Sequence, residues 1–106
     1  MKVYFRQGSP LDRLETDPAF DAELPSETVS MYRRRMQQLR AFHSETDITS
    51  SRALDVSPVP DLGPDFFSIH ICSGQRLLIH LLGDKPRREV AVLEIVHVKH
   101  PARRVK

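Results

Sequence analysis

The sequence predicts a single α+β domain in which two N-terminal helices pack on one face of an antiparallel sheet. In the first half of the chain, apolar residues recur at intervals of three and four, as they do along one face of a helix. After residue 64 the pattern becomes that of strands, with alternating or continuous apolar residues between short turns. The expected order of elements is β-α-α-β-β-β.

Length and composition fit one small globular domain. The chain has 106 residues, so we expect a single domain over residues 1–106 and no second, separate catalytic domain. No apolar run reaches the about 18 residues that a membrane-spanning helix needs, and the first residues lack the apolar stretch of a signal peptide. The single cysteine, Cys72, excludes an internal disulfide. We therefore expect a cytoplasmic protein with no membrane contact.

The first elements are marked by residues typical of their ends. Residues 2–6 are β-branched and aromatic, which predicts a short strand. Ser9 followed by Pro10 is typical of a helix start, because proline lacks the N–H that would be unpaired there, and this helix is expected to end before Pro18. A second helix is expected to open at residues 25–27 with Ser26 as its N-cap.

The second helix is predicted to have one apolar and one basic face. The apolar positions are Val29, Tyr32, Met36 and Leu39. The other side carries Arg33, Arg34, Arg35, Gln37, Gln38 and Arg40. A charge run of this kind is most often a solvated face, and the alternative is a stripe that binds a partner.

The second half of the chain is predicted to be a loop followed by strands. Residues 44–65 are polar and proline-rich, and within this loop residues 52–56 fit a short strand or an extended arm. A three-stranded antiparallel meander is then predicted over residues 66–72, 75–82 and 89–98. The last strand is nearly continuously apolar, which predicts a central position in the sheet.

Polar side chains are expected on the face of the sheet that the helices leave open. Side chains alternate along a strand, so Ser68, His70 and Cys72 should share one face of their strand. The side chains expected to gather on the open face are Ser68, His70, Arg76 and His80. Near the end of the last strand, His97 and Lys99 fall on one side, and His100 follows.

An arginine among histidines on a sheet face suits the cleavage of a phosphodiester bond. Cleavage of RNA needs a base for the 2′-hydroxyl proton, a cation for the phosphorane and an acid for the leaving oxygen. Imidazole titrates near neutral pH and serves either proton-transfer role. The alternative is that a histidine on a half-buried strand is an ordinary core or rim residue, and only one or two of the four are expected to be functional.

Neither a metal nor a cofactor is expected. The histidines come without the carboxylate or cysteine pattern of a zinc site. The four glycines are dispersed, so there is no phosphate-binding glycine loop, and no serine nucleophile motif is present.

The formal net charge of +2 conceals an uneven distribution of charge. Acidic residues collect in the first thirty positions, whereas residues 85–106 carry seven bases against Glu89 and Glu94. Arginine outnumbers lysine, and its planar guanidinium suits phosphate binding. The C-terminal end is therefore a candidate polyanion-binding surface.

Three stretches in the second half of the chain follow the expected order of elements, namely GPDFFSIHI (63–71), QRLLI (75–79) and LEIVHVKH (93–100). Together with the order of elements, they resemble the RelE/ParE superfamily, the toxins of type II toxin-antitoxin systems, and most of all its HigB-like branch. The resemblance covers most of the chain. The three stretches correspond to the family's glycine-led strand, its strand with a tryptophan-arginine start, and its last strand.

The resemblance implies a RelE-like fold and a ribosome-dependent mRNA endoribonuclease that inhibits translation without a cofactor. It implies three partners, namely a cognate antitoxin, the ribosome and mRNA. Arg76 matches the strand arginine that contacts the scissile phosphate, and Arg52 matches a basic position before the leucine-glycine loop. The expected catalytic residues are Arg76, His97, Lys99 and His100. The expected RNA-binding residues are Arg52, His70, His80, Arg103 and Arg104.

Two other functions stay open. The tail from His97 to Arg104 also fits the ParE-like branch, whose members inhibit DNA gyrase and cut no RNA. A third possibility is a degenerate member that binds a partner or a nucleic acid without chemistry.

Overall fold

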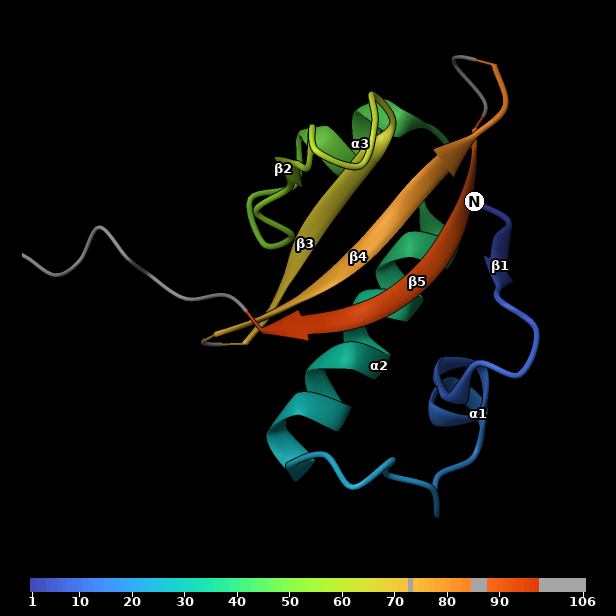
Figure 1. The fold of residues 1–106 in the computed structure, drawn as a ribbon, viewed down its shortest axis with the longest axis vertical. Helices are drawn as coiled ribbons and strands as arrows, with labels where there is room; N and C mark the ends of the chain where they lie inside the picture. Colours follow the sequence, from blue (N-terminus) through green and yellow to red (C-terminus); the bar gives the residue numbers. More distant parts are fainter. Residues whose placement is uncertain (73, 85–87, 98–106) are drawn as a thin grey trace, which may run out of the picture.

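The computed structural model describes residues 1–72, 74–84 and 88–97, and this part of the chain forms three helices and five strands (Figure 1). The helices are α1 (Pro10–Thr16), α2 (Ser26–Ala41) and α3 (Glu45–Thr49). The strands are β1 (Val3–Phe5), β2 (Ser57–Pro58), β3 (Phe66–Cys72), β4 (Gln75–Leu82) and β5 (Glu89–His97). The predicted α+β class, with helices packed against a sheet, is confirmed. No helix of this part of the chain is long and apolar enough to cross a membrane.

The five strands form one sheet in the order β1-β5-β4-β3-β2. The antiparallel meander of β3, β4 and β5 is as predicted. The short β1 differs from the expectation, because it pairs in parallel with β5 and makes the sheet mixed. β5 consequently has a strand on each side, and β4 is the middle strand of the five.

Helix α2 covers one face of the sheet and lies behind it in Figure 1. The predicted apolar face of this helix is buried, and it packs on the core side chains of β3, β4 and β5. Tyr32 is fully buried, and its hydroxyl donates a hydrogen bond of 2.7 Å to the carbonyl of Leu11, which ties α2 to α1. Burial raises the pKa of Tyr32 above its usual value, so this hydroxyl stays a donor.

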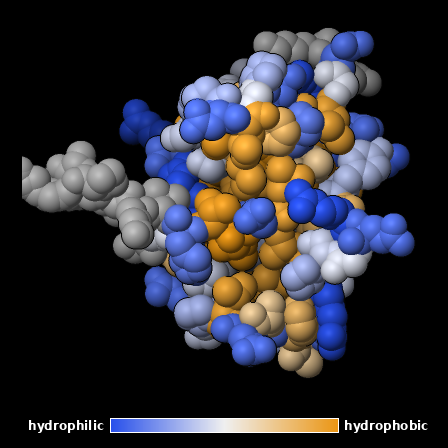
Figure 2. Space-filling view, viewed as in Figure 1, coloured by the Kyte–Doolittle hydropathy of each residue, from blue (hydrophilic) through white to orange (hydrophobic). Residues whose placement is uncertain are grey.

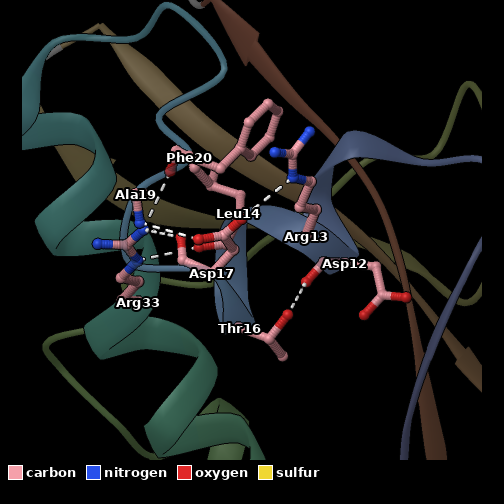
Figure 3. Close-up of polar contacts among 8 residues, drawn as sticks. All are labelled: Asp12, Arg13, Leu14, Thr16, Asp17, Ala19, Phe20 and Arg33. Carbon is pink, nitrogen blue, oxygen red and sulfur yellow. Dashed lines mark hydrogen bonds and ion pairs between the residues drawn. The ribbon is translucent and has the colours of Figure 1, made fainter.

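The basic side of α2 is mostly used inside the molecule. The Arg33 guanidinium binds three carbonyl oxygens where α1 ends, donating to Leu14 and Asp17 at 2.9 Å each and to Phe20 at 3.1 Å (Figure 3). These carbonyls lack helical partners, so Arg33 caps α1 and fixes the loop that follows it.

Two further arginines of α2 act in the same way. Arg35 is 5% exposed, and its Nε donates a hydrogen bond of 2.6 Å to the carbonyl of His70 in β3. Arg40 makes two hydrogen bonds to Glu15 of α1, of 2.5 and 2.8 Å. The expected solvated face is therefore limited to residues such as Arg34, which is exposed.

The start of α2 also differs from the expectation, because Pro25 rather than Ser26 holds the N-cap position and no side chain caps the helix.

The segment between α2 and β3 is more structured than the sequence predicts. Residues 45–49 form α3, which opens with a capping box between Ser44 and Asp47. Residues 52–55 form a turn instead of the expected strand or arm, and the strand β2 follows at residues 57–58. Ile48 and Leu54 are buried and attach this segment to the core.

Two irregularities of strand register change which side chains share a face. The first lies between His70 and Cys72 in β3 and turns Cys72 toward α2, where its thiol contacts Thr28 and Gln75 at 3.5 and 3.0 Å. The expectation that Cys72 shares the face of His70 is therefore wrong. The second irregularity lies opposite Leu78 and Ile79 in β4 and leaves Leu93 of β5 as the extra residue.

Candidate functional site

The sheet face that α2 leaves uncovered has a polar corner and an apolar strip. Ser68, His70, Arg76 and His80 lie on this face, as the alternation predicts, because the residues between them pack into the core. The apolar side chains of β3, β4 and β5 outside the core cluster are Phe66, Leu78, Leu82, Ala91, Leu93 and Val96. Figure 2 shows apolar side chains gathered in a band over the strands of the same view.

Arg76 is the centre of the polar corner, and its side chain is only 15% exposed. Its Nε donates to the Ser68 hydroxyl at 2.8 Å, and its Nη2 donates to the Ser68 carbonyl at 3.0 Å. The Nη1 donates to the Asp55 carboxylate at 3.1 Å, and Nη2 also contacts the Asp55 carbonyl. These contacts hold the planar guanidinium in one orientation on the open face.

Asp55 is a site residue that the sequence analysis did not single out. It lies in the turn over residues 52–55, and its side chain is 71% exposed although it is paired with Arg76. Its backbone φ of 44° is in the left-handed region, which aspartate adopts more readily than most residues. An aspartate among turn residues is too common to stand out, and nothing in the local sequence indicates its contact with Arg76.

His70 is the described histidine that the fold brings next to Arg76. The two residues are direct partners in the register of β3 and β4, so their side chains are neighbours on the open face. The backbone of His70 is held on both sides, because its N–H donates to Leu54 at 2.7 Å and its carbonyl accepts from Arg35 at 2.6 Å. A cation, a carboxylate and an imidazole therefore meet at one corner of the sheet.

His80 lies farther along the same face of β4. It is four residues from Arg76, or about 13 Å along the strand. Its ring stacks on Phe66 of β3, with the ring centres 3.9 Å apart and the planes at 5°. His80 is thus separate from the Arg76 corner.

None of the other predicted site residues that the structure describes forms a hydrogen bond or ion pair with the Arg76 side chain. His97 is exposed and is the register partner of Gln75, which faces α2, so it belongs to the opposite side of the sheet from Arg76. Arg52 is exposed in the turn that carries Asp55, and its carbonyl accepts the Asp55 N–H at 3.2 Å. Lys99, His100, Arg103 and Arg104 lie outside the described residues.

Arg88, which lies just before β5, is held more tightly than Arg76. Arg88 is 8% exposed, and its Nη1 lies 2.9 Å from Glu45 of α3 and 3.1 Å from Asp65, just before β3. Its Nε donates to the carbonyl of Gly83 at 3.1 Å. The hydrogen bonds to Asp65 and Glu45 raise the pKa of Arg88 above its usual value.

Within residues 1–72, 74–84 and 88–97, no group of three or more His, Cys, Asp or Glu side chains could hold a metal ion. The Arg76 corner combines a cation, a carboxylate and an imidazole. Its guanidinium suits an anion such as phosphate, and the adjacent carboxylate and imidazole can accept or donate protons.

No protein-family model matches the sequence, and no curated protein matches it. The five-stranded sheet with α2 against one face is similar in fold to a solved structure. The solved structure that carries this comparison is a YoeB/ParE toxin from Agrobacterium tumefaciens, with a TM-score of 0.59. The match covers 93% of this chain and 100% of that one at 14% sequence identity, so the likeness is one of fold.

Proposed function

We propose that this protein is a toxin of the RelE/ParE superfamily that cleaves mRNA on translating ribosomes. The observation that carries the proposal is the Arg76 guanidinium, which is fixed on the open sheet face of a toxin-like fold beside a carboxylate and an imidazole. The motif likeness of residues 63–100 supports the HigB-like branch. Its partners would be an antitoxin, the ribosome and mRNA, in the cytoplasm.

Arg76 would bind the scissile phosphate and stabilise the negative charge of the phosphorane. To do so it exchanges its contact with the Asp55 carboxylate for a phosphate oxygen, while Ser68 keeps the guanidinium oriented. The exchange is favoured because Asp55 is largely exposed and is hydrated when it leaves. The guanidinium therefore has an anionic partner before and after the exchange.

Proton transfer would fall to the groups around Arg76. The Asp55 carboxylate, once released, can accept the proton of the 2′-hydroxyl, and the neighbouring His70 can donate a proton to the leaving oxygen. Lys99 and His100 of the tail stay candidates for the acid, whereas His97 lies on the opposite side of the sheet from Arg76. Arg52, Arg103 and Arg104 would hold the RNA by charge.

The proposal is tested by Arg76→Ala, with Arg34→Ala as the matched control on an exposed site of α2. In a translating extract, the wild-type protein and Arg34→Ala should create new 5′ ends within coding regions. Arg76→Ala should lower the cleavage rate about a hundredfold, because it removes the cation that faces the developing charge. Primer extension measures the cleavage.

Because Arg76→Ala also removes internal hydrogen bonds, its fold is checked by circular dichroism and thermal unfolding. Arg76→Lys serves as a second variant, since it keeps the charge but loses the paired donors and should also cleave slowly. Cleavage at the wild-type rate by a folded Arg76→Ala protein would contradict the assignment.

A second candidate is a toxin of the ParE type that binds DNA gyrase without cutting RNA. The observation that favours it is the guanidinium of Arg76, each nitrogen of which already has an acceptor within the protein. Inhibition of gyrase supercoiling by the purified protein, with no new mRNA 5′ ends, would select this function. RNA binding without cleavage or gyrase inhibition would indicate a non-catalytic member instead.

A further inference from the structure

Four side chains form a row across four neighbouring strands on the open sheet face. Phe66 of β3 pairs with His80 of β4, His80 pairs with Ala91 of β5, and Ala91 pairs with Tyr4 of β1. All four lie on the face opposite α2, because their sequence neighbours in each strand pack into the core. We call Phe66, His80, Ala91 and Tyr4 the aromatic row.

The aromatic row has a gap above the small side chain of Ala91, between the rings of His80 and Tyr4, and we call this gap the low point. On one side of it stands the His80 ring, whose far face is already covered by Phe66 at 3.9 Å. On the other side stands Tyr4, which is 38% exposed and is one of the few exposed large apolar side chains among the described residues. The alanine methyl is much shorter than either ring and is itself partly exposed, so solvent reaches the space between His80 and Tyr4.

The surroundings of the low point are charged in a way that suits a nucleotide. The Lys2 ammonium lies over the Tyr4 ring, 5.6 Å from its centre, and provides a cation at one end of the row. Glu89 lies two residues before Ala91 on the same strand and therefore on the same face. A carboxylate at that place can accept a hydrogen bond from a base amino group.

We propose that the aromatic row binds a base of single-stranded RNA, which stacks over Ala91 between His80 and Tyr4. The proposal rests on the proposed function for the nature of the ligand. The bound base would belong to a nucleotide near the cleavage point, since His80 is about 13 Å from Arg76 along the same face of β4. Stacking would fix the position of this base, and Glu89 beside the row would favour a base that carries an amino group.

Stacking is the interaction that the two rings beside Ala91 can offer a base. A base between two rings is stabilised by stacking, and every base has a flat face to offer. An aromatic side chain of a protein partner is the alternative occupant. The lysine beside Tyr4 and the arginine farther along the face favour the nucleotide, because its phosphates are anions on both sides of the base.

The test uses a short RNA with a fluorescent adenine analogue and the variant Ala91→Leu, which fills the low point. The wild-type protein should quench the analogue on binding, because stacked rings quench its fluorescence. Ala91→Leu should abolish the quenching and weaken binding about tenfold. Ala41→Leu, the same change at the exposed end of α2, should behave as the wild type.

Tyr4→Phe and Tyr4→Ala test the row at an exposed position where the fold is little affected. The phenylalanine variant keeps the ring and should quench as the wild type does, whereas the alanine variant should not. Cleavage on ribosomes with unchanged quenching in Ala91→Leu would overturn this inference and leave the proposed function standing. If the wild-type protein quenches the adenine analogue but cleaves no mRNA, the nuclease proposal is rejected and the base site stands. If RNA binds without quenching, the base site is rejected in favour of a protein partner on the aromatic row.

Discussion

The two arginines that face the segment from α3 to β3 are held in different ways. Arg88 is 8% exposed and contacts two carboxylates, one of which is 19% exposed and the other 39%. Arg76 is 15% exposed but contacts a single carboxylate that is 71% exposed. The same acidic segment thus binds one arginine in a closed site and the other in an open one.

The difference indicates which of the two arginines can bind a ligand. At Arg88 a ligand would have to displace Glu45 and Asp65 and leave buried charge without a partner, which is costly. At Arg76 it has to displace only Asp55, whose carboxylate is 71% exposed and can be hydrated when it leaves. The Arg88 site is therefore structural, whereas Arg76 can exchange its carboxylate partner for an anionic ligand.

The largest effect on stability is expected for Arg88→Met. Removing the guanidinium leaves Glu45 and Asp65 facing each other without a cation, and the free energy of unfolding should fall by about 3 kcal/mol. Guanidinium chloride unfolding measures it. The matched control Arg34→Met changes an exposed arginine and should stay within about 0.5 kcal/mol of the wild type. A loss at Arg88 no larger than that of the control would remove the distinction between the two sites.

A smaller effect on stability is expected for Arg76→Met. Its carboxylate partner can turn to water, so the loss is that of the Ser68 hydrogen bonds and an exposed ion pair, about 1–2 kcal/mol. A double-mutant cycle with Asp55→Asn should give a coupling energy below about 1 kcal/mol. A coupling of several kcal/mol would mean that the Asp55 contact is not exchangeable, and the proposed phosphate binding would lose its basis.

The fold was predictable because it depends on local patterns. The three-and-four spacing of Val29, Tyr32, Met36 and Leu39 identified the buried side of α2, and Ser9-Pro10 gave the start of α1. Helix α3 was missed because its five residues bury only Ile48, too little for a period to appear. The parallel pairing of β1 depends on contacts with β5 that no local pattern reports.

The site was less predictable because it depends on register and on distant partners. The period of two assigned His70 and Arg76 to one face correctly, but it failed at Cys72, beyond an irregularity that adds a residue to the strand. The acid that pairs with Arg76 is twenty-one positions away in a turn, and the partners of Arg88 come from two further places. Such pairs follow from the folded backbone and not from spacing.

Glu45 of α3 binds Arg88, so the pH dependence of stability tests how firmly α3 holds this carboxylate in place. The N–H groups of His43 and Ser44 donate to the Asp47 carboxylate at 2.7 and 3.3 Å and lower its pKa below the usual value. A carboxyl whose pKa is lowered by folding adds stability above its unfolded pKa of about 4, and this stability is lost as the pH falls further. The stability of the wild type should thus fall more steeply between neutral pH and pH 3 than that of Asp47→Asn. Asp61→Asn, a change in the exposed loop before β3, should keep the wild-type slope, and equal slopes for all three proteins would show that the capping box does not hold α3 in place.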